Sequence, residues 1–270
     1  LSLHDALPIS WMFAEPIELA SPEGTRRGLV IGGKVEPSDP GAPAAGGDRT
    51  AVLGLLLPQS DPAKADDYVW RPLTAVHWTM SIVVHDLDGD GRSDILYSDK
   101  HGPESGVFWL ENPGADAFGG VWPRHTITRG VESTMLITLA DLDADGEPEI
   151  VAPIDHAPVG DAPKQRSIRI LRRRDAAATR WTAIDLPVPA ATGQPKSIAA
   201  GDVDGDGRID LVVTSTGAFD GQMGAYWLER TGDSLRPASW RVNRIAGPEG
   251  IKFDLVHLLD LDADGDLDVL

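Results

Sequence analysis

The chain has 270 residues, and its 42 Asp and Glu against 24 Lys and Arg give a formal net charge of −18 at pH 7. Nucleic acids and anionic lipid surfaces are bound by clustered Lys and Arg, so this acidic balance argues against nucleic acid and against membrane as partners. The chain has no cysteine, which excludes disulfides, thiolate zinc sites and cysteine nucleophiles, and no apolar run approaches the ~18 residues of a membrane-spanning helix.

Residues 1–10, LSLHDALPIS, resemble the translation of a common sequencing-library adapter. We therefore expect this segment to be an artefact and exclude it from the fold prediction. Residues 11–26 carry no assignable pattern and stay unassigned. The sequence also stops inside a repeat, so we expect a fragment, in which a signal peptide is not observable.

Comparison of the sequence with itself reveals a repeat of ~58 residues. Four acidic segments align without gaps: DLDGDGRSDIL at 86–96, DLDADGEPEIV at 141–151, DVDGDGRIDLV at 202–212 and DLDADGDLDVL at 260–270. The tryptophans Trp70, Trp122, Trp181 and Trp240 keep the same spacing, and the segments GVFWLEN, IRILRR and GAYWLER follow the acidic segments. Three markers in register indicate copies of one structural unit.

Each copy contains four short apolar or alternating runs separated by turn residues, which predicts four β-strands. In the third copy the predicted strands are residues 197–203, 210–215, 225–229 and 240–245. No stretch with a period of 3.6 separates the runs, so a β-helix-β arrangement is disfavoured. Four strands at this period are typical of a β-propeller blade.

The expected fold is therefore all-β: an incomplete β-propeller with a partial blade, three full blades and the start of another. In the partial blade, residues 28–34 and 51–57 are the predicted second and third strands, joined by a long loop. The predicted divisions are a partial blade at 27–69, blades at 70–121, 122–180 and 181–239, and a truncated blade at 240–270.

The acidic segments share the pattern D-x-D-x-D-G-x-x-D, in which the first, third, fifth and ninth side chains converge. Carboxylates without His or Cys suit Ca²⁺ rather than zinc. An EF-hand needs an acid at position twelve, where this chain has Tyr97, Ala152 or Val213, between strands rather than helices. The alternative is a set of solvated Asp-Gly turns, which the mutual repulsion of four close carboxylates disfavours.

We therefore expect one structural Ca²⁺ for each complete acidic loop. The predicted ligands are Asp86, Asp88, Asp90 and Asp94; Asp141, Asp143, Asp145 and Glu149; Asp202, Asp204, Asp206 and Asp210; and Asp260, Asp262, Asp264 and Asp268. Extracellular modules of this type bind calcium at ~10⁻⁴–10⁻³ M, an affinity that suits a location outside the cytosol.

The segment SIAAGDVDGDGRIDLVV at residues 197–213 resembles the FG-GAP/VCBS repeat of integrin-alpha-type β-propellers, and the resemblance covers about residues 27–270. It implies a calcium loop between the first two strands of each blade. It also implies a bacterial secreted, periplasmic or surface protein, of which some are lectin-like or adhesive and a minority are lyases or dehydratases acting on sugars. The chain departs from the pattern where the Phe-Gly pair would stand, as at Thr79-Met80 and Pro195-Lys196.

At the end opposite the acidic loops, we expect the second-to-third-strand loops, 99–104, 154–166 and 216–223, to meet the segments that lead into each first strand. There Trp78 can stack on a sugar, and Lys100, Lys196 and Asp254 are further candidates for ligand binding. Candidate bases or acids are His77, His101, His156 and Lys252. The alternative is that these charges are simply solvated in loops free to diverge.

These features predict a calcium-binding extracytoplasmic repeat protein that binds carbohydrate or an extracellular protein, in adhesion for example. The alternative function is a polysaccharide lyase or sugar dehydratase, in which a His or Lys abstracts a proton in the funnel. The patterns show neither a Ser-His-Asp set nor a phosphate-binding glycine loop, so catalysis is the less favoured hypothesis.

Overall fold

The computed structural model describes residues 10–21, 24–35, 50–61, 63–102, 104–130, 132–156, 165–247 and 252–270. The predicted adapter segment lies outside these residues except for Ser10, and so does most of the predicted loop in residues 35–50. The chain divides into two compact units: unit 1 is Leu1–Val131 with Ala176–Thr179, and unit 2 is Glu132–Asp175 with Arg180–Leu270. We describe each unit by itself.

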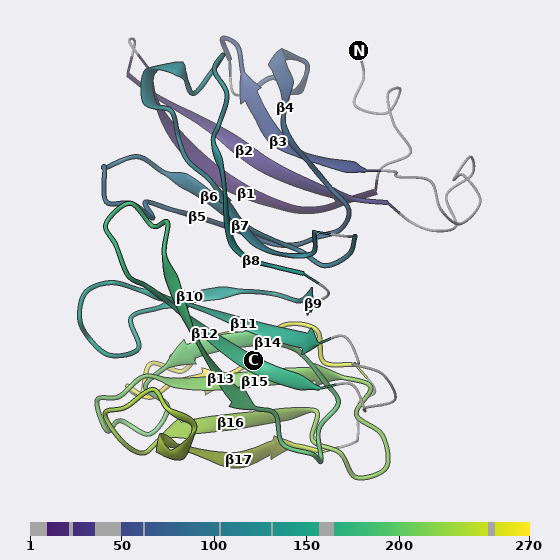
Figure 1. Ribbon diagram of the computed structural model, residues 1–270, viewed down its shortest axis with the longest axis vertical. Helices are drawn as coiled ribbons and strands as arrows, with labels where there is room; N and C mark the ends of the chain where they lie inside the picture. Colours follow the sequence, from purple (N-terminus) through teal and green to yellow (C-terminus); the bar gives the residue numbers. More distant parts are fainter. Residues whose placement is uncertain are drawn as a thin grey trace. The chain divides into compact units, whose positions relative to one another are not determined.

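Unit 1 contains two antiparallel sheets of four strands each, in which every strand pairs with the next along the chain (Figure 1). The first sheet is β1 (Ser10–Ser21), β2 (Gly24–Lys34), β3 (Ala51–Pro58) and β4 (Tyr68–Val76). The second is β5 (Thr79–His85), β6 (Asp94–Asp99), β7 (Gly106–Leu110) and β8 (Arg124–Arg129). Short 3-10 turns, η1 (Ala65–Asp67) and η2 (Gly114–Asp116), lie in the connections.

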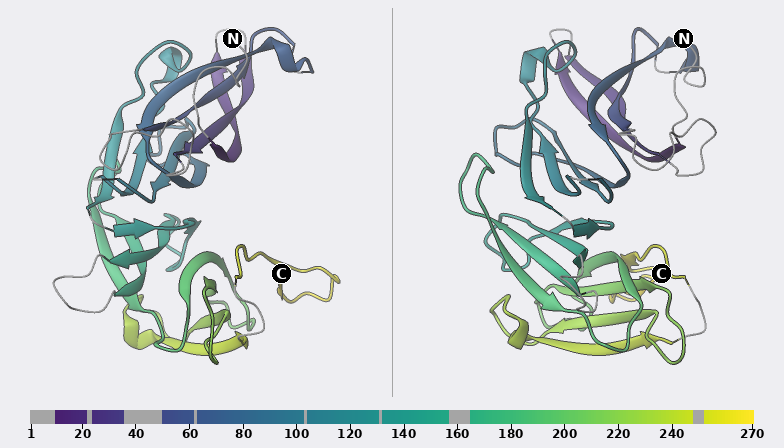
Figure 2. Two further views of the ribbon diagram at one scale, coloured as in Figure 1. Left: turned by 90° about the vertical axis from the view of Figure 1, so that its right-hand side faces the viewer. Right: turned by 45° about the vertical axis from the view of Figure 1, so that its right-hand side comes forward.

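Unit 2 repeats this architecture (Figure 2). In its first sheet the leading strand is split into β9 (Glu132–Thr134) and β10 (Thr138–Ala140), which both pair with β11 (Glu149–His156), followed by β12 (Arg166–Arg173) and β13 (Trp181–Pro187). Its second sheet is β14 (Gln194–Gly201), β15 (Asp210–Thr216), β16 (Ala225–Arg230) and β17 (Trp240–Ala246), with η3 (Pro237–Ser239) before the last strand. A final hairpin pairs β18 (Leu258–Leu259) with β19 (Asp268–Val269). The all-β prediction of four-stranded, blade-like sheets is confirmed.

The first sheet corrects one part of the prediction. The supposed partial blade is a complete four-stranded sheet, because residues left unassigned form β1, whose register with β2 runs from Ser10↔Lys34 to Ser21↔Gly24. This hairpin closes without an acidic loop: the Ser21 hydroxyl donates to the carbonyl of Gly24 at 2.7 Å, and Gly24 takes a φ of +123°. Because no acidic marker stands between β1 and β2, the repeat pattern could not reveal the strand.

The sheets also begin at different residues from the predicted blade divisions. Trp70 lies within β4, while Trp181 and Trp240 open β13 and β17, and each of these is the last strand of its sheet. Divisions that start at the tryptophans therefore join the last strand of one sheet to the first strands of the next. The four strands predicted for the third copy coincide with β14–β17 to within a few residues.

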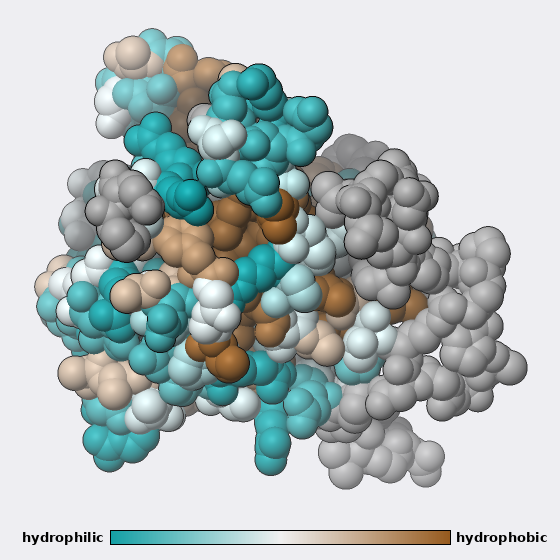
Figure 3. Space-filling model, turned by 90° about the horizontal axis from the view of Figure 1, so that it is seen from above, coloured by the Kyte–Doolittle hydropathy of each residue, from teal (hydrophilic) through white to brown (hydrophobic). Residues whose placement is uncertain are grey.

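Burial along the strands explains why these segments form stacked sheets. The middle strands β6 and β7 are buried along their whole length, whereas the last strands β8 and β17 alternate between partly buried and exposed residues. In unit 1 one apolar cluster includes Leu55, Ile95 and Phe108, which come from both sheets. Exposed apolar residues form small groups between hydrophilic ones on the face drawn in Figure 3. The hydrophobic core therefore lies between successive sheets of a unit.

Arginine side chains tie successive sheets together within each unit. In unit 1, the Arg71 guanidinium on β4 donates to the carbonyls of Ala117 and Gly120, next to η2. In unit 2, Arg230 at the end of β16 is buried, and its guanidinium reaches the carbonyl of Leu142 in the loop after β10. A guanidinium offers five donors in a fixed geometry, so one side chain can serve several carbonyls.

We expect Arg230→Met to destabilise unit 2 by about 3 kcal/mol, because the Leu142, Gly232 and Asp233 carbonyls lose charged donors in a buried setting. Thermal or denaturant unfolding measures the change. The matched control is Arg236→Met, since the Arg236 side chain is exposed and such substitutions usually change stability by less than ~0.5 kcal/mol. Equal effects of the two substitutions would contradict the structural role of Arg230.

Candidate functional site

Each repeat carries its acidic loop between the first and second strands of a sheet, as predicted. The first acidic loop (residues 86–94) joins β5 to β6, and the second (141–149) joins β10 to β11. The third (202–210) joins β14 to β15, and the fourth (260–268) joins β18 to β19. The loops therefore occupy equivalent places in four successive repeats.

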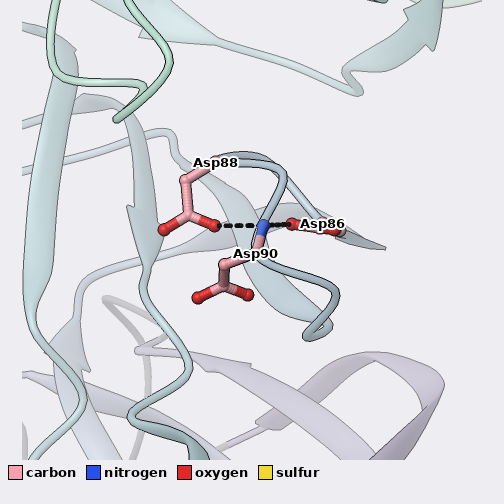
Figure 4. A group of neighbouring side chains, drawn as sticks. All are labelled: Asp86, Asp88 and Asp90. Atoms are coloured by element: carbon pink, nitrogen blue, oxygen red, sulfur yellow. Dashed lines mark hydrogen bonds between the residues drawn. The ribbon is translucent and has the colours of Figure 1, made fainter.

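Each loop brings three carboxylates together, with oxygens that lie within 4.8 Å of one another. The groups are Asp86, Asp88 and Asp90; Asp141, Asp143 and Glu149; Asp202, Asp204 and Asp206; and Asp260, Asp262 and Asp268. Figure 4 shows the first group on one turn of the backbone. The convergence predicted for the first and third positions occurs in every loop, whereas Asp94, Asp145, Asp210 and Asp264 lie outside these groups.

Backbone hydrogen bonds to the first Asp fold each loop. In the first loop, Asp86 accepts hydrogen bonds from the amides of Gly89 at 2.8 Å, Asp90 at 3.0 Å and Gly91 at 2.8 Å. The invariant glycine of the motif, here Gly91 with a φ of +83°, adopts a left-handed conformation that strains other residues. Two of these hydrogen bonds, donated by the amides at loop positions five and six, recur in the other loops, where Asp141, Asp202 and Asp260 accept them. The motif's spacing is thus dictated by the turn as well as by ligand chemistry.

The ninth residue anchors the loop to its sheet. Asp94 is buried, and its two oxygens accept hydrogen bonds from the amides of Leu87 at 2.9 Å and Asn112 at 2.8 Å. Asp210 does the same with the amides of Val203 at 3.1 Å and Arg230 at 2.7 Å. These two carboxylates therefore connect the start of each loop to the backbone at the end of the third strand, with or without a bound cation.

The same burial makes the loops electrostatically costly without a cation. Desolvation, reinforced by the charges of Asp88 and Asp90, raises the pKa of Asp94 to about 7. Desolvation likewise raises the pKa of Glu149 to about 7, and desolvation followed by the Asp90 charge raises the pKa of Asp88. Close carboxylates that resist ionisation are stabilised by a cation among them.

The donor set fits a hard divalent cation. The groups that converge in the loops contain carboxylate oxygens alone, and Ca²⁺ takes six to eight oxygens, which backbone carbonyls and waters can complete. Nitrogen or sulfur donors, which zinc and copper prefer, do not enter these groups. The acidic loops can therefore hold metal ions such as Ca²⁺.

At the opposite end of the second sheet in unit 1, several predicted candidates meet around Trp78. The His101 ring lies edge-on to it with 5.1 Å between ring centroids, and the Lys100 and Lys34 ammonium groups lie 5.5 and 4.6 Å from the Trp78 ring. His77 Nδ1 lies 3.7 Å from Asp99, a buried residue that also accepts the amides of His77 and Trp78. Trp78 is thus partly covered by cations rather than fully open for stacking.

The candidates of unit 2 are held in polar contacts. Asp254 pairs with Lys196 through one oxygen and with Lys252 through the other, the latter at 2.8 Å. His156 Nε2 lies 2.9 Å from the Ser167 hydroxyl, which in turn lies 3.3 Å from an oxygen of Asp185. In this group Ser167 lies between His156 and Asp185, so it does not have the order Asp-His-Ser in which a histidine activates a serine.

A hollow of about 520 Å³ opens at this end of unit 2. Its lining consists of Arg166, Gly193, Gln194, Thr216, Gly217, Phe219, Asp220 and Gln222. None of the ligand-binding candidates Trp78, Lys100, Lys196 and Asp254 lines it. The useful signal in the sequence was the loop 216–223, where the exposed Phe219 lies in a segment rich in glycine and polar residues.

We expect Asp88→Asn and Asp94→Asn to act differently in melting experiments with excess chelator and with millimolar calcium. Asp88→Asn removes a charge that points into the group, so it should reduce the increase in Tm produced by calcium without lowering Tm in chelator. Asp94→Asn loses one buried backbone hydrogen bond, so it should lower stability by about 1–3 kcal/mol in both conditions. An unchanged calcium effect in Asp88→Asn would contradict metal binding by the first loop.

Calcium stabilisation should also depend on pH. The raised pKa of Asp94 in the first loop means that the calcium-free folded chain binds more protons than the unfolded chain between about pH 4 and 7, so its stability falls as pH rises through that window. Calcium binds the deprotonated carboxylates and offsets this loss. We therefore expect a larger calcium-induced increase in Tm at pH 8 than at pH 5, and the reverse order would contradict this assignment.

Comparison with known proteins agrees with the geometry of the loops. A model of the FG-GAP-like repeat family matches residues 86–152 and 202–270, which together make up just over half of the chain. The two matches begin on Asp86 and Asp202, the first carboxylates of the first and third acidic loops. No curated protein matches the sequence. The chain therefore belongs to the FG-GAP-like repeat family.

Proposed function

We propose that this chain is a calcium-stabilised, extracytoplasmic binding module and that its ligand is a carbohydrate. The observation that carries the proposal is the hollow of unit 2, which lies at the end of the sheets opposite the acidic loops and presents an exposed aromatic ring among polar groups. The acidic loops fix the strands, and the opposite loops carry the specificity.

The calcium part of the proposal is supported by the convergent carboxylates and by their raised pKa values. Exposed loops of this kind suit the weak affinities of extracellular calcium modules, ~10⁻⁴–10⁻³ M, which exceed cytosolic calcium concentrations. Such sites fill outside the cytosol, which supports a secreted, periplasmic or cell-surface location. Among the described residues, no helix is long and apolar enough to cross a membrane.

The chemistry of the hollow favours a sugar over an apolar ligand. Its volume of about 520 Å³ lies within the ~300–1,000 Å³ of small-molecule sites. The Phe219 side chain is 56% exposed and can cover the C–H face of a sugar ring. Arg166, Gln194 and Asp220 add donors and acceptors for hydroxyl groups.

The same geometry favours binding over catalysis. A lyase or dehydratase needs a base aimed at the substrate, with a pKa suited to proton abstraction. Lys196 and Lys252 instead pair with Asp254, and His156 contacts Ser167. These engaged groups support a binding module, with an extracellular protein as the alternative ligand.

We expect Phe219→Ala to weaken binding of oligosaccharides about tenfold or more, the effect of losing one stacking contact of ~1.4 kcal/mol. A glycan array followed by calorimetry measures it. The matched control is Val242→Ala, an exposed apolar residue on β17 that does not line the hollow. Unchanged sugar binding in Phe219→Ala would contradict the proposed site. Binding of a protein ligand, with no sugar bound, would contradict the proposed ligand class.

A further inference from the structure

The second repeat differs in charge from the first and third at two equivalent positions, one in the acidic loop and one on the third strand of the sheet. Strand registers pair Ile95 with Leu110, Ile150 with Leu171 and Leu211 with Leu228, so the residues that follow these leucines are equivalent. These equivalent residues are Glu111, Arg172 and Glu229, and the seventh loop residues are Arg92, Glu147 and Arg208. The second copy thus exchanges both charges relative to its two neighbours.

The exchange puts a guanidinium inside the second loop. Arg172 Nη2 lies 2.6 Å from an oxygen of Asp143 and 2.5 Å from an oxygen of Asp145, while its Nε lies 3.6 Å from Glu149 Oε1. Arg172 therefore contacts the third, fifth and ninth acids of the motif together. These are three of the four carboxylates that the motif directs toward a metal ion.

The arginines of the first and third loops lie differently. Arg92 donates through Nε to the carbonyl of Asn112 at 2.9 Å and pairs with Asp90, the fifth acid of the first loop. Arg208 donates through Nε to the carbonyl of Arg230 at 2.8 Å and pairs with Asp206, the fifth acid of the third loop. Each thus has one loop carboxylate as its partner and a strand carbonyl as its anchor.

The residues equivalent to Arg172 add negative charge near these two loops. Glu111 lies 2.8 Å from His125 Nε2, and Glu229 accepts a hydrogen bond from Arg241 Nε at 2.8 Å, so each is paired with the last strand of its sheet. In the second repeat, the equivalent residue Arg172 is positively charged, and its guanidinium contacts the carboxylates of the loop. A net surplus of carboxylates therefore remains in the first and third loops and is reduced in the second.

We propose that the guanidinium of Arg172 serves as the cation of the second acidic loop, so that this loop keeps its shape without calcium while the first and third loops take the metal. The inference rests on the calcium binding proposed above. A guanidinium stays protonated at any physiological pH and offers several fixed donors, so it holds several carboxylates without dissociating. Asp143 Oδ1 is buried without a hydrogen-bond partner among the described residues, so the charge of this carboxylate is balanced through its other oxygen, which Arg172 contacts.

Hydrogen exchange of the whole chain, measured by mass spectrometry with chelator and with calcium, reads each loop separately. At a calcium concentration about ten times the Kd, local opening of a metal-binding loop is suppressed about tenfold. We expect that slowing in peptides covering residues 86–94 and 202–210, and a change of less than about twofold in peptides covering 141–149. If calcium slows exchange in the second loop as much as in the first and third, the inference about Arg172 is wrong, while the calcium proposal still holds.

Arg172→Gln makes the test specific. We expect this variant to exchange faster at residues 141–149 in chelator and to regain protection in calcium, because its loop has lost the built-in cation. Arg174→Gln is the matched control, since Arg174 donates to the Thr182 hydroxyl at 2.9 Å on the same stretch and contacts no loop carboxylate among the described ion pairs. If calcium does not slow exchange at residues 141–149 of Arg172→Gln, the inference is wrong. If calcium slows exchange in none of the wild-type loops, the calcium proposal is wrong as well.

Discussion

Four of the repeats share one physical constraint, a group of carboxylates that the backbone of the acidic loop brings together. The amides of the turn donate to the first Asp, and this geometry directs the neighbouring acids toward one point. Repulsion between them would open the loop, and with it the hairpin between the first and second strands. A cation held by such a loop would therefore contribute to the folding energy of the sheet that carries it.

The loops are also connected to the rest of their sheets. Asp94 and Asp210 accept amides from the start of their loops and from the end of the third strand, so one carboxylate fixes three strands of a sheet. At the other end, buried Asp99 likewise accepts the amides of His77 and Trp78 in unit 1. In unit 2, the exposed Phe219 in the loop 216–223 lines the hollow, and exposed loops tolerate sequence change better than strands do.

The sequence predicted those features that repeat and missed those that occur once. Repetition of the acidic motif placed the loops between first and second strands and located β14–β17. The sequence did not reveal β1 because no acidic marker stands between β1 and β2. It did not reveal the pairing of Lys196 with Asp254 because this pair joins β14 to the segment before β18. Ion pairs depend on side-chain positions that spacing does not specify, so the sequence did not reveal that Lys196 and Lys252 both pair with Asp254.

The second loop has a mechanical reason to carry its own cation. Arg230, buried at the end of the following sheet, donates to the carbonyl of Leu142, and the amide of Leu142 donates to Glu149. Opening of this loop would therefore release both its own hairpin and the contact that joins the two sheets of unit 2. A bound calcium ion dissociates when its concentration falls, whereas a covalently attached guanidinium stays beside the loop. Where a loop also supports its neighbour, the proposed role of Arg172 makes that support independent of the calcium concentration.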